Sequence, residues 1–319
     1  MIKRFSLLFI LIFINFPLFA QKAKAPFKEM NFRVPTGQGR LFGTLALPRD
    51  SNTNTLCIIV PGSGPTDRNG NTGSFVFANS YKFLSDSLAK HGYPVLRFDK
   101  RGVGESRYVY NSETELRFGL YVQDLNLIID RARKIKGIEK IVLIGHSEGA
   151  TVALMAALRD SVHAYVSLCG PGQSADSLIL TQLKTQPLSI QNEALEIIKL
   201  INMGKTTDKV SEPLMALFRP SIQAYLKSWF DIHPDIEISQ LNIPTFIIQG
   251  ATDIQVSVQE SKRLAKAKPD ADYVIISDMN HVLKKASDNR SQNIRTYGDP
   301  YQPLHPELTP LLLEFLKEL

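Results

Sequence analysis

Cysteine and tryptophan are scarce in this chain of 319 residues, which has two cysteines and one tryptophan. Two cysteines cannot build a disulfide framework, so the small disulfide-stabilised proteins are excluded as a class. Cys57 and Cys169 both lie in apolar runs, and we expect them to be buried free thiols. No group of His and Cys residues has the spacing of a metal site, so we expect neither a metal nor a cofactor.

A strong charge imbalance is also missing. The formal net charge is +6, and no long basic run or alternation of basic and aromatic residues occurs. Nucleic acid is therefore not an expected partner. The glycine-containing segment "CIIVPGSGPTDRNG" lacks the G-K-[ST] ending that grips a nucleotide phosphate, which argues against a phosphate-binding loop.

Only one long apolar run is present, in the N-terminal segment "MIKRFSLLFILIFINFPLFAQ". Two basic residues precede the run and the small Ala20 ends it, a pattern typical of a secretory signal peptide over residues 1–20. A retained membrane anchor is the alternative, because the run is nearly long enough to cross a bilayer. Pro17 and the cleavage-like triplet ending at Ala20 favour removal. We therefore expect an exported protein, periplasmic or secreted, with no stable membrane insertion after cleavage.

After this segment, strand-like and helix-like patterns alternate, which predicts an α/β fold with a mostly parallel, doubly wound sheet. The rhythm breaks at residues 174–236, where four helical segments follow one another without a strand. We interpret this stretch as an inserted helical cap, and ordinary packing helices of the sheet are the alternative. The predicted core is then formed by residues 21–173 and 237–319.

A serine lies between glycines where a predicted strand turns into a helix, in Gly-His-Ser-Glu-Gly at residues 145–149. This segment fits G-x-S-x-G in the strand–turn–helix context that the motif requires. The glycines permit a sharp turn from which Ser147 protrudes, and the following helix N-terminus adds positive potential. Ser147 is the predicted nucleophile. A serine that merely caps the helix is the alternative.

A serine hydroxyl needs a base, which a third group must orient. Of the six histidines, His281 directly follows the last predicted strand, at the edge where ligands bind in such sheets. His281 is the predicted base. Asp253, in the loop after the preceding strand, is the predicted acid, and Asp278 is the alternative. The chain order Ser, Asp, His is the one associated with this motif.

Acyl transfer also needs donors for the developing oxyanion. The loop "PGSGPTDRNG" follows the central strand with two glycines, which allow the backbone to approach a substrate closely. The backbone N–H groups of Ser63 and of Glu148, the residue after the nucleophile, are the predicted donors. We further expect Arg68, Lys284 and Lys285 to lie in loops facing the pocket. Arg68 is expected to pin its loop, and a contact with a substrate carboxylate is the alternative.

The segments "PGSGPTDRNG", "RFDKRGVGES", "GHSEG", "IQGATDIQV" and "MNHVLK" together resemble the α/β-hydrolases. Within that superfamily the chain is similar to exported bacterial carboxylesterases related to the serine aminopeptidase and prolyl-oligopeptidase lineage. The resemblance implies Ser147, Asp253 and His281 as a catalytic triad, with Ser63 and Glu148 forming the oxyanion hole. One departure is Pro61, where many relatives have histidine.

These observations predict a serine hydrolase that cleaves small-molecule carboxylic esters. An exported aminopeptidase or acyl-peptidase is the nearest alternative. Such an enzyme would hold a substrate amine with acidic groups, for which the first part of the cap offers Glu193, Glu196, Asp208 and Glu212. A thioesterase for CoA esters is disfavoured by export. A noncatalytic binding protein on the same fold is the alternative from another class.

Overall fold

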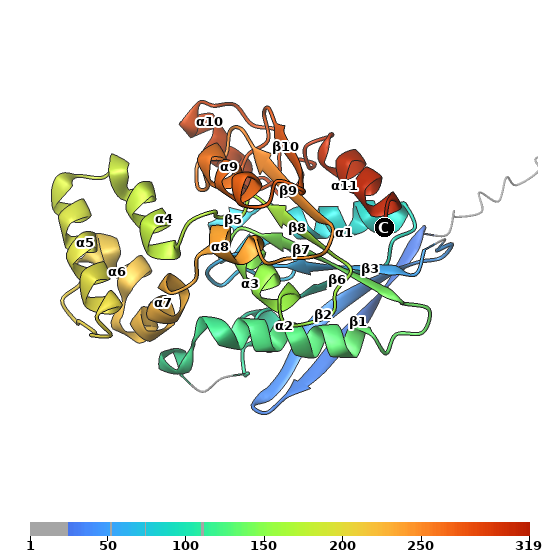
Figure 1. The fold of residues 1–319 in the computed structure, drawn as a ribbon, viewed down its shortest axis with the longest axis horizontal. Coiled ribbons are helices and arrows are strands. Elements are labelled where there is room, and N and C mark those ends of the chain that lie inside the picture. Colours follow the sequence, from blue (N-terminus) through green and yellow to red (C-terminus); the bar gives the residue numbers. More distant parts are fainter. Residues whose placement is uncertain (1–24, 52, 74, 110–111) are drawn as a thin grey trace, which may run out of the picture.

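The computed structural model describes residues 25–51, 53–73, 75–109 and 112–319, so the predicted signal peptide lies outside the described residues. An eight-stranded sheet forms the centre, in the order β1-β2-β6-β3-β7-β8-β9-β10 (Figure 1). β1 pairs antiparallel with β2 and β2 with β6, whereas every pairing from β6 to β10 is parallel. The predicted mostly parallel α/β sheet is confirmed.

The strands of this sheet are β1 (Phe27–Thr36), β2 (Gly39–Pro48), β3 (Thr55–Val60), β6 (Val95–Phe98), β7 (Lys140–His146), β8 (Ala164–Leu168), β9 (Thr245–Gly250) and β10 (Asp272–Ile276). A separate two-stranded ribbon pairs β4 (Asn71–Thr72) with β5 (Val76–Phe77). β3 is buried along its whole length, which explains its apolar sequence after Thr55, since a strand covered on both faces has no solvent-facing positions.

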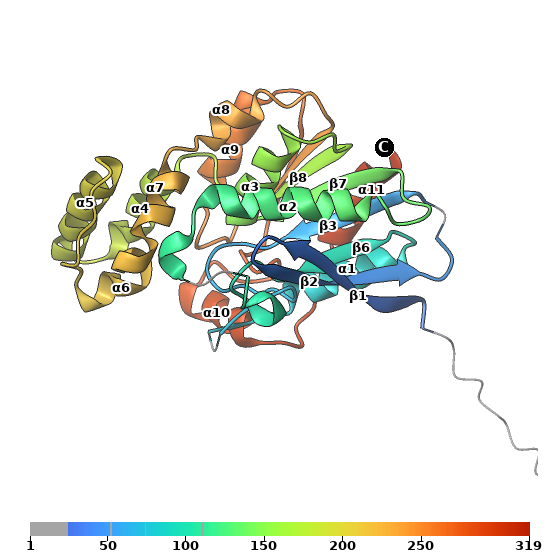
Figure 2. The same ribbon diagram turned by 90° about the horizontal axis from the view of Figure 1, so that it is seen from below.

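Helices cover both faces of the sheet (Figures 1 and 2). Alternate side chains of a strand point to opposite faces. Leu56 and Ile58 accordingly pack in the apolar cluster that includes side chains of α2 (Phe118–Ala132) and α3 (Glu148–Ala157). Cys57 and Ile59 pack in a second cluster with side chains of α1 (Ser80–Lys90) and α11 (Leu308–Lys317). Cys57 and Cys169 are both buried and free, as expected.

The first four of the five α-helices between β8 and β9 are α4 (Ala175–Gln182), α5 (Leu188–Asn202), α6 (Glu212–Phe218) and α7 (Gln223–Phe230). They lie together at one end of the molecule, beyond the sheet, in both views (Figures 1 and 2). Their apolar side chains form a cluster of their own, which includes Ile197, Phe218 and Leu226. The fifth is α8 (Pro234–Ile238), and the remaining α-helices are α9 (Val258–Ala267) and α10 (Arg290–Arg295). None of the helices in the described ranges combines the length and apolar character that a membrane span requires.

The strand order creates a topological switch point between β3 and β7. From β3 the chain passes to β6 on one side, and from β7 it passes to β8 on the other side. Ligands of such sheets bind in the crevice outside the carboxyl ends of the strands at this point. The loop with Ser63 leaves β3 there, and Ser147 directly follows β7. The fold therefore places the predicted oxyanion loop beside the predicted nucleophile.

Candidate active site

The backbone of Ser147 adopts φ 56° and ψ −127°, a conformation that L-residues rarely adopt. A strained non-glycine residue persists only where its surroundings hold it, and such residues cluster at functional sites. The two flanking glycines cannot be replaced without displacing backbone. A Cβ on Gly145 would lie 2.4 Å from the carbonyl oxygen of Gly149, and a Cβ on Gly149 would lie 2.2 Å from that of Val60. Ser147 itself is partly exposed, whereas both of its neighbours are buried.

The loop after β3 packs against this turn. A Cβ built on Gly62 would lie 3.1 Å from the Cβ of Ser147. Ser63, Ser147 and Glu148 all line one cavity of about 500 Å³. Glu148 begins helix α3, whose first N–H groups have no acceptor within the helix. The two predicted oxyanion donors and the predicted nucleophile thus border the same space.

His281 and Asp253 form a hydrogen-bonded pair, with 2.7 Å between Nδ1 of the imidazole and Oδ2 of the carboxylate. The other carboxylate oxygen of Asp253 accepts the backbone N–H groups of Gln255 at 2.8 Å and Val256 at 2.9 Å. Burial raises the pKa of Asp253, but the charge of His281 and these hydrogen bonds outweigh burial, so the net shift is downward. Asp278, the alternative acid, instead contacts His305 at 2.6 Å and Lys285 at 2.9 Å.

His146, inside the turn, is hydrogen-bonded to helix α1 and to the loop of His281. Its Nε2 lies 2.7 Å from the backbone carbonyl oxygen of His281, and its Nδ1 lies 2.8 Å from the hydroxyl of Tyr81. Burial, followed by the charge of His281, lowers the pKa of His146 to about 3, so the ring is neutral. Because a carbonyl can only accept, Nε2 carries the proton and Nδ1 accepts the Tyr81 proton. The Tyr81 oxygen in turn accepts the backbone N–H of Gly62 at 3.0 Å.

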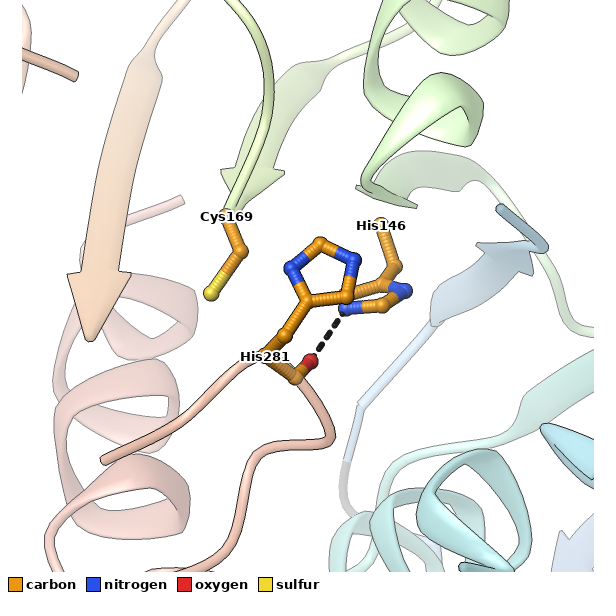
Figure 3. Close-up of side chains that lie close together, drawn as sticks. All are labelled: His146, Cys169 and His281. Atoms are coloured by element: carbon orange, nitrogen blue, oxygen red, sulfur yellow. Dashed lines mark hydrogen bonds between the residues drawn. The ribbon is translucent and has the colours of Figure 1, made fainter. Parts of the chain in front are cut away.

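Figure 3 shows His146, Cys169 and His281 close together. Their potential ligand atoms lie within 4.8 Å of one another. A metal would have to displace existing hydrogen bonds, since both ring nitrogens of His146 and Nδ1 of His281 are bonded. Burial, followed by the charge of Asp253, also raises the pKa of the Cys169 thiol, whereas a metal ligand must be a thiolate. This donor set fits a hydrogen-bond network better than a metal site.

A buried charged cluster lies beneath the turn. The ammonium of Lys100 donates to the carbonyl oxygen of Gly62 at 2.5 Å and lies 3.8 Å from the Glu148 carboxylate. Tyr225, on α7, donates its hydroxyl proton to the same carboxylate. The ammonium also lies 5.0 Å from the ring centre of Tyr121. The residue after the predicted nucleophile is therefore bonded to both the core and α7.

The cavity is walled on one side by apolar and aromatic side chains of the helices between β8 and β9, among them Leu178, Ile179, Ile222, Tyr225 and Trp229. Its charged lining residues are paired. Arg101 forms two hydrogen bonds with Asp124, and Arg219 forms two with Glu113. Each of these two arginines is thus paired with a carboxylate.

Lys284 and Lys285 do not face the pocket as expected, whereas Arg68 has the loop-pinning role that the sequence favoured. Arg68 donates to Asp99 and Glu105, both at 2.6 Å, and pins its own loop. Lys284 is fully buried and donates to the backbone of Asp299, and Lys285 pairs with Asp278. None of the three lines the cavity.

Sequence reasoning missed Tyr81, Lys100 and the double hydrogen bonding of His146. Lys100 lies in the segment "RFDKRGVGES", directly after a strand, and His146 lies in "GHSEG", beside the nucleophile. These positions were the one indication of a role that the sequence offered. Tyr81 sits in the first turn of α1 and carries no motif at all.

Comparison with protein families gives a match to the serine aminopeptidase S33 model over residues 73–285, well over half of the chain. The chain belongs to this family of α/β-hydrolases. The predicted resemblance to the α/β-hydrolases is thereby confirmed. The match includes the predicted nucleophile, acid and base, whereas Ser63 precedes it.

Among characterised relatives, the chain is similar to the esterase EstD of Thermotoga maritima, with 22% identity over 248 residues. That match covers 76% of this chain but only 57% of the relative. A hydrolase of a Pseudomonas species, acting on 2-hydroxy-6-oxononadienedioate and its trienedioate analogue, is 22% identical over 271 residues, covering 78% of this chain and 89% of the relative.

Est1E and Pf2001 are among the solved structures that share the fold. Est1E from Butyrivibrio proteoclasticus, with ferulic acid bound, has a TM-score of 0.61 at 18% identity and covers 90% of this chain and 98% of its own. The Pyrococcus furiosus esterase Pf2001 has a TM-score of 0.57 at 19% identity and covers 92% and 93%. At these identities the likeness concerns the fold alone.

Proposed function

We propose that this protein is a serine hydrolase that cleaves carboxylic esters through an acyl-enzyme on Ser147. One observation carries the proposal: a serine in a strained turn at the sheet's switch point opens onto an apolar cavity of about 500 Å³. The side chain of Ser147 makes no capping hydrogen bond to helix α3. Its hydroxyl is therefore available to a bound substrate. The similarity to the esterase EstD supports ester hydrolysis.

In the proposed mechanism, Ser147 attacks the ester carbonyl while Nε2 of His281 takes its proton. Asp253 holds the proton on Nδ1 of His281, which leaves Nε2 free to act as the base. The backbone N–H groups of Ser63 and Glu148 stabilise the tetrahedral oxyanion. His281 then protonates the departing alcohol, and water attacks the acyl-enzyme by the same steps in reverse.

An aminopeptidase is the second candidate, which the name of the matching family favours. It would need a carboxylate available to hold a substrate amine. Of the described residues that line the cavity, the carboxylates are Glu113, paired with Arg219, and Glu148, paired with Lys100 and Tyr225. The acidic residues expected from the first part of the cap, Glu193, Glu196, Asp208 and Glu212, are not among the lining residues described. The cavity therefore favours a neutral ester.

A panel of p-nitrophenyl esters and aminoacyl anilides tests this assignment. We expect kcat/KM for short-chain esters to exceed that for any anilide at least tenfold, about 1.4 kcal/mol of differential transition-state binding. A fluorophosphonate probe should label the protein once, and Ser147→Ala should abolish the labelling. The reverse ranking would indicate a peptidase. Inert Ser147 and no turnover would indicate a noncatalytic binding protein.

We further propose that the protein is exported and that residues 1–20 are removed. The basic start, apolar run and small residue at position 20 support this proposal. N-terminal sequencing of the protein recovered from its native host should then begin at Gln21. A mature chain that still begins at residue 1 and stays with the membrane fraction would indicate an anchor instead.

A further inference from the structure

The peptide groups of Gly62, directly before the predicted donor Ser63, are held from both sides. The N–H of Gly62 donates to the hydroxyl oxygen of Tyr81 at 3.0 Å. Its carbonyl oxygen accepts from the ammonium of Lys100 at 2.5 Å. Tyr81 and Lys100 come from different elements, helix α1 and the loop after β6. A loop glycine would otherwise be free to rotate both of its backbone dihedrals.

The carbonyl of Gly62 and the N–H of Ser63 belong to one peptide unit. This unit is planar and trans, so its C=O and its N–H point in opposite directions. Lys100 holds the carbonyl on the buried side, where Lys100 itself lines a small internal cavity together with Tyr121. The N–H of Ser63 must then point away from that interior, and Ser63 borders the large cavity beside Ser147.

Burial of the Lys100 ammonium is energetically unfavourable. Its side chain is only 4% exposed, and burial lowers its pKa, although the nearby Glu148 carboxylate opposes that shift. Taking an ammonium out of water is unfavourable unless it is paired and hydrogen-bonded. Its polar partners include Gly62 and Glu148. Gly62 directly precedes the predicted donor Ser63, and Glu148 is the other predicted donor.

We propose that Lys100 and Tyr81 are positioning residues of the oxyanion hole. Lys100 holds the Gly62–Ser63 peptide and Tyr81 holds the preceding Pro61–Gly62 peptide, so that the Ser63 N–H is aimed before substrate binds. A hydrogen bond to the Gly62 carbonyl also polarises the peptide and strengthens the Ser63 N–H as a donor. Donors that are oriented in advance need no reorganisation when the oxyanion forms. This inference rests on the proposed ester hydrolysis.

Lys100→Met tests it, because methionine keeps the length of the side chain and removes the donor. Lys268→Met is the matched control, since Lys268 is also buried and donates to a backbone carbonyl, that of Leu241 at 2.9 Å. For Lys100→Met we expect kcat on a p-nitrophenyl ester to fall by ~10–10²-fold, somewhat less than the loss of a whole donor, with KM changed less than threefold. Lys268→Met should keep kcat within twofold.

A trifluoromethyl ketone separates positioning from general damage to the fold, because its adduct with Ser147 carries the oxyanion. The affinity of Lys100→Met for this ketone should fall by the same factor as kcat/KM, while thermal stability matches that of the control variant. Tyr81→Phe, which keeps the ring and removes the acceptor of the Gly62 N–H, should show the same pattern at a smaller size, ~3–30-fold. It provides the test if Lys100→Met does not fold.

Three outcomes overturn the inference. Unchanged ketone affinity in Lys100→Met would show that Lys100 does not act on the oxyanion hole, and unchanged affinity in Tyr81→Phe would show the same for Tyr81. A rise in KM with unchanged kcat would place their effect on substrate binding instead. In both cases the wild-type protein still hydrolyses esters, so the proposed function survives. A wild-type protein that neither hydrolyses esters nor binds the ketone overturns both.

Discussion

Tyr225 of helix α7 donates its hydroxyl proton to the carboxylate of Glu148, the residue that directly follows the predicted nucleophile. Burial raises the pKa of Tyr225 well above its usual value, so the hydroxyl keeps the proton that this bond requires. Tyr225 also contacts Tyr121 of α2 edge-to-face, with ring centres 5.8 Å apart. The helices over the cavity are thus bonded to the turn that carries Ser147.

Removing this hydroxyl should cost stability. We expect Tyr225→Phe to lower the free energy of unfolding by about 1–3 kcal/mol, because a buried carboxylate loses one of its hydrogen bonds. Chemical denaturation measures the change. Tyr273→Phe is the control, since the Tyr273 ring is partly exposed and its hydroxyl contacts the Ser261 hydroxyl at 3.2 Å. It should change stability by less than ~0.5 kcal/mol. Equal losses in both variants would contradict a special role for the Glu148 contact.

The two candidate acids can be distinguished by one matched pair of substitutions. Asp253→Asn should reduce kcat on esters by ~10⁴-fold, because an amide at this position favours the wrong tautomer of His281. Asp278→Asn should leave kcat within a few-fold of wild type, since Asp278 contacts His305 and Lys285 rather than His281. Steady-state kinetics on one p-nitrophenyl ester measures both. Greater damage from Asp278→Asn would reverse the assignment.

His146 should make stability depend on pH. Its pKa is about 3 in the folded protein and near 6.5 in an unfolded chain. Below pH ~6.5 the unfolded chain binds a proton that the folded protein does not, so this contribution is complete at neutral pH and is lost as pH falls toward 3. His146→Gln removes the titrating group. The wild-type advantage in unfolding free energy over this variant should shrink by about 1.4 kcal/mol per pH unit between pH 6 and 4. Parallel pH curves from urea denaturation would contradict the assignment.

The cavity walls should set the preferred acyl length. Ile222 is buried at the cavity, so Ile222→Trp should fill part of the space and shift the preference toward shorter acyl chains. One or two methylenes in such a pocket are worth about 1–3 kcal/mol each, so the ratio of kcat/KM between butyrate and octanoate esters should change at least tenfold. Leu195→Trp is the control, because Leu195 is exposed on α5 and does not line the cavity. An unchanged ratio in Ile222→Trp would show that acyl chains bind elsewhere.

Local patterns in the sequence were sufficient for the sheet and for the turn at Ser147. The apolar run of β3 predicts a strand because every position of a strand covered on both faces is buried. The turn can be predicted because residues 145–149 are contiguous and both glycines are sterically required. The alternation of strands and helices determines a mostly parallel sheet, since parallel strands need crossover connections.

The tertiary structure alone decided which distant groups meet. Asp253 and Asp278 both follow strands near His281, and only the folded loop shows that the carboxylate of Asp253 reaches the ring. Nothing in the sequence distinguishes Lys100 from the other lysines. Its burial and its bond to Gly62, 38 residues away, depend on the neighbouring positions of β6 and β3 in the sheet. His146 bonds across 65 and 135 residues to Tyr81 and His281. Hydrogen bonds of this kind have no period and no spacing in the sequence, because they arise only where separate strand ends converge at one edge of the sheet.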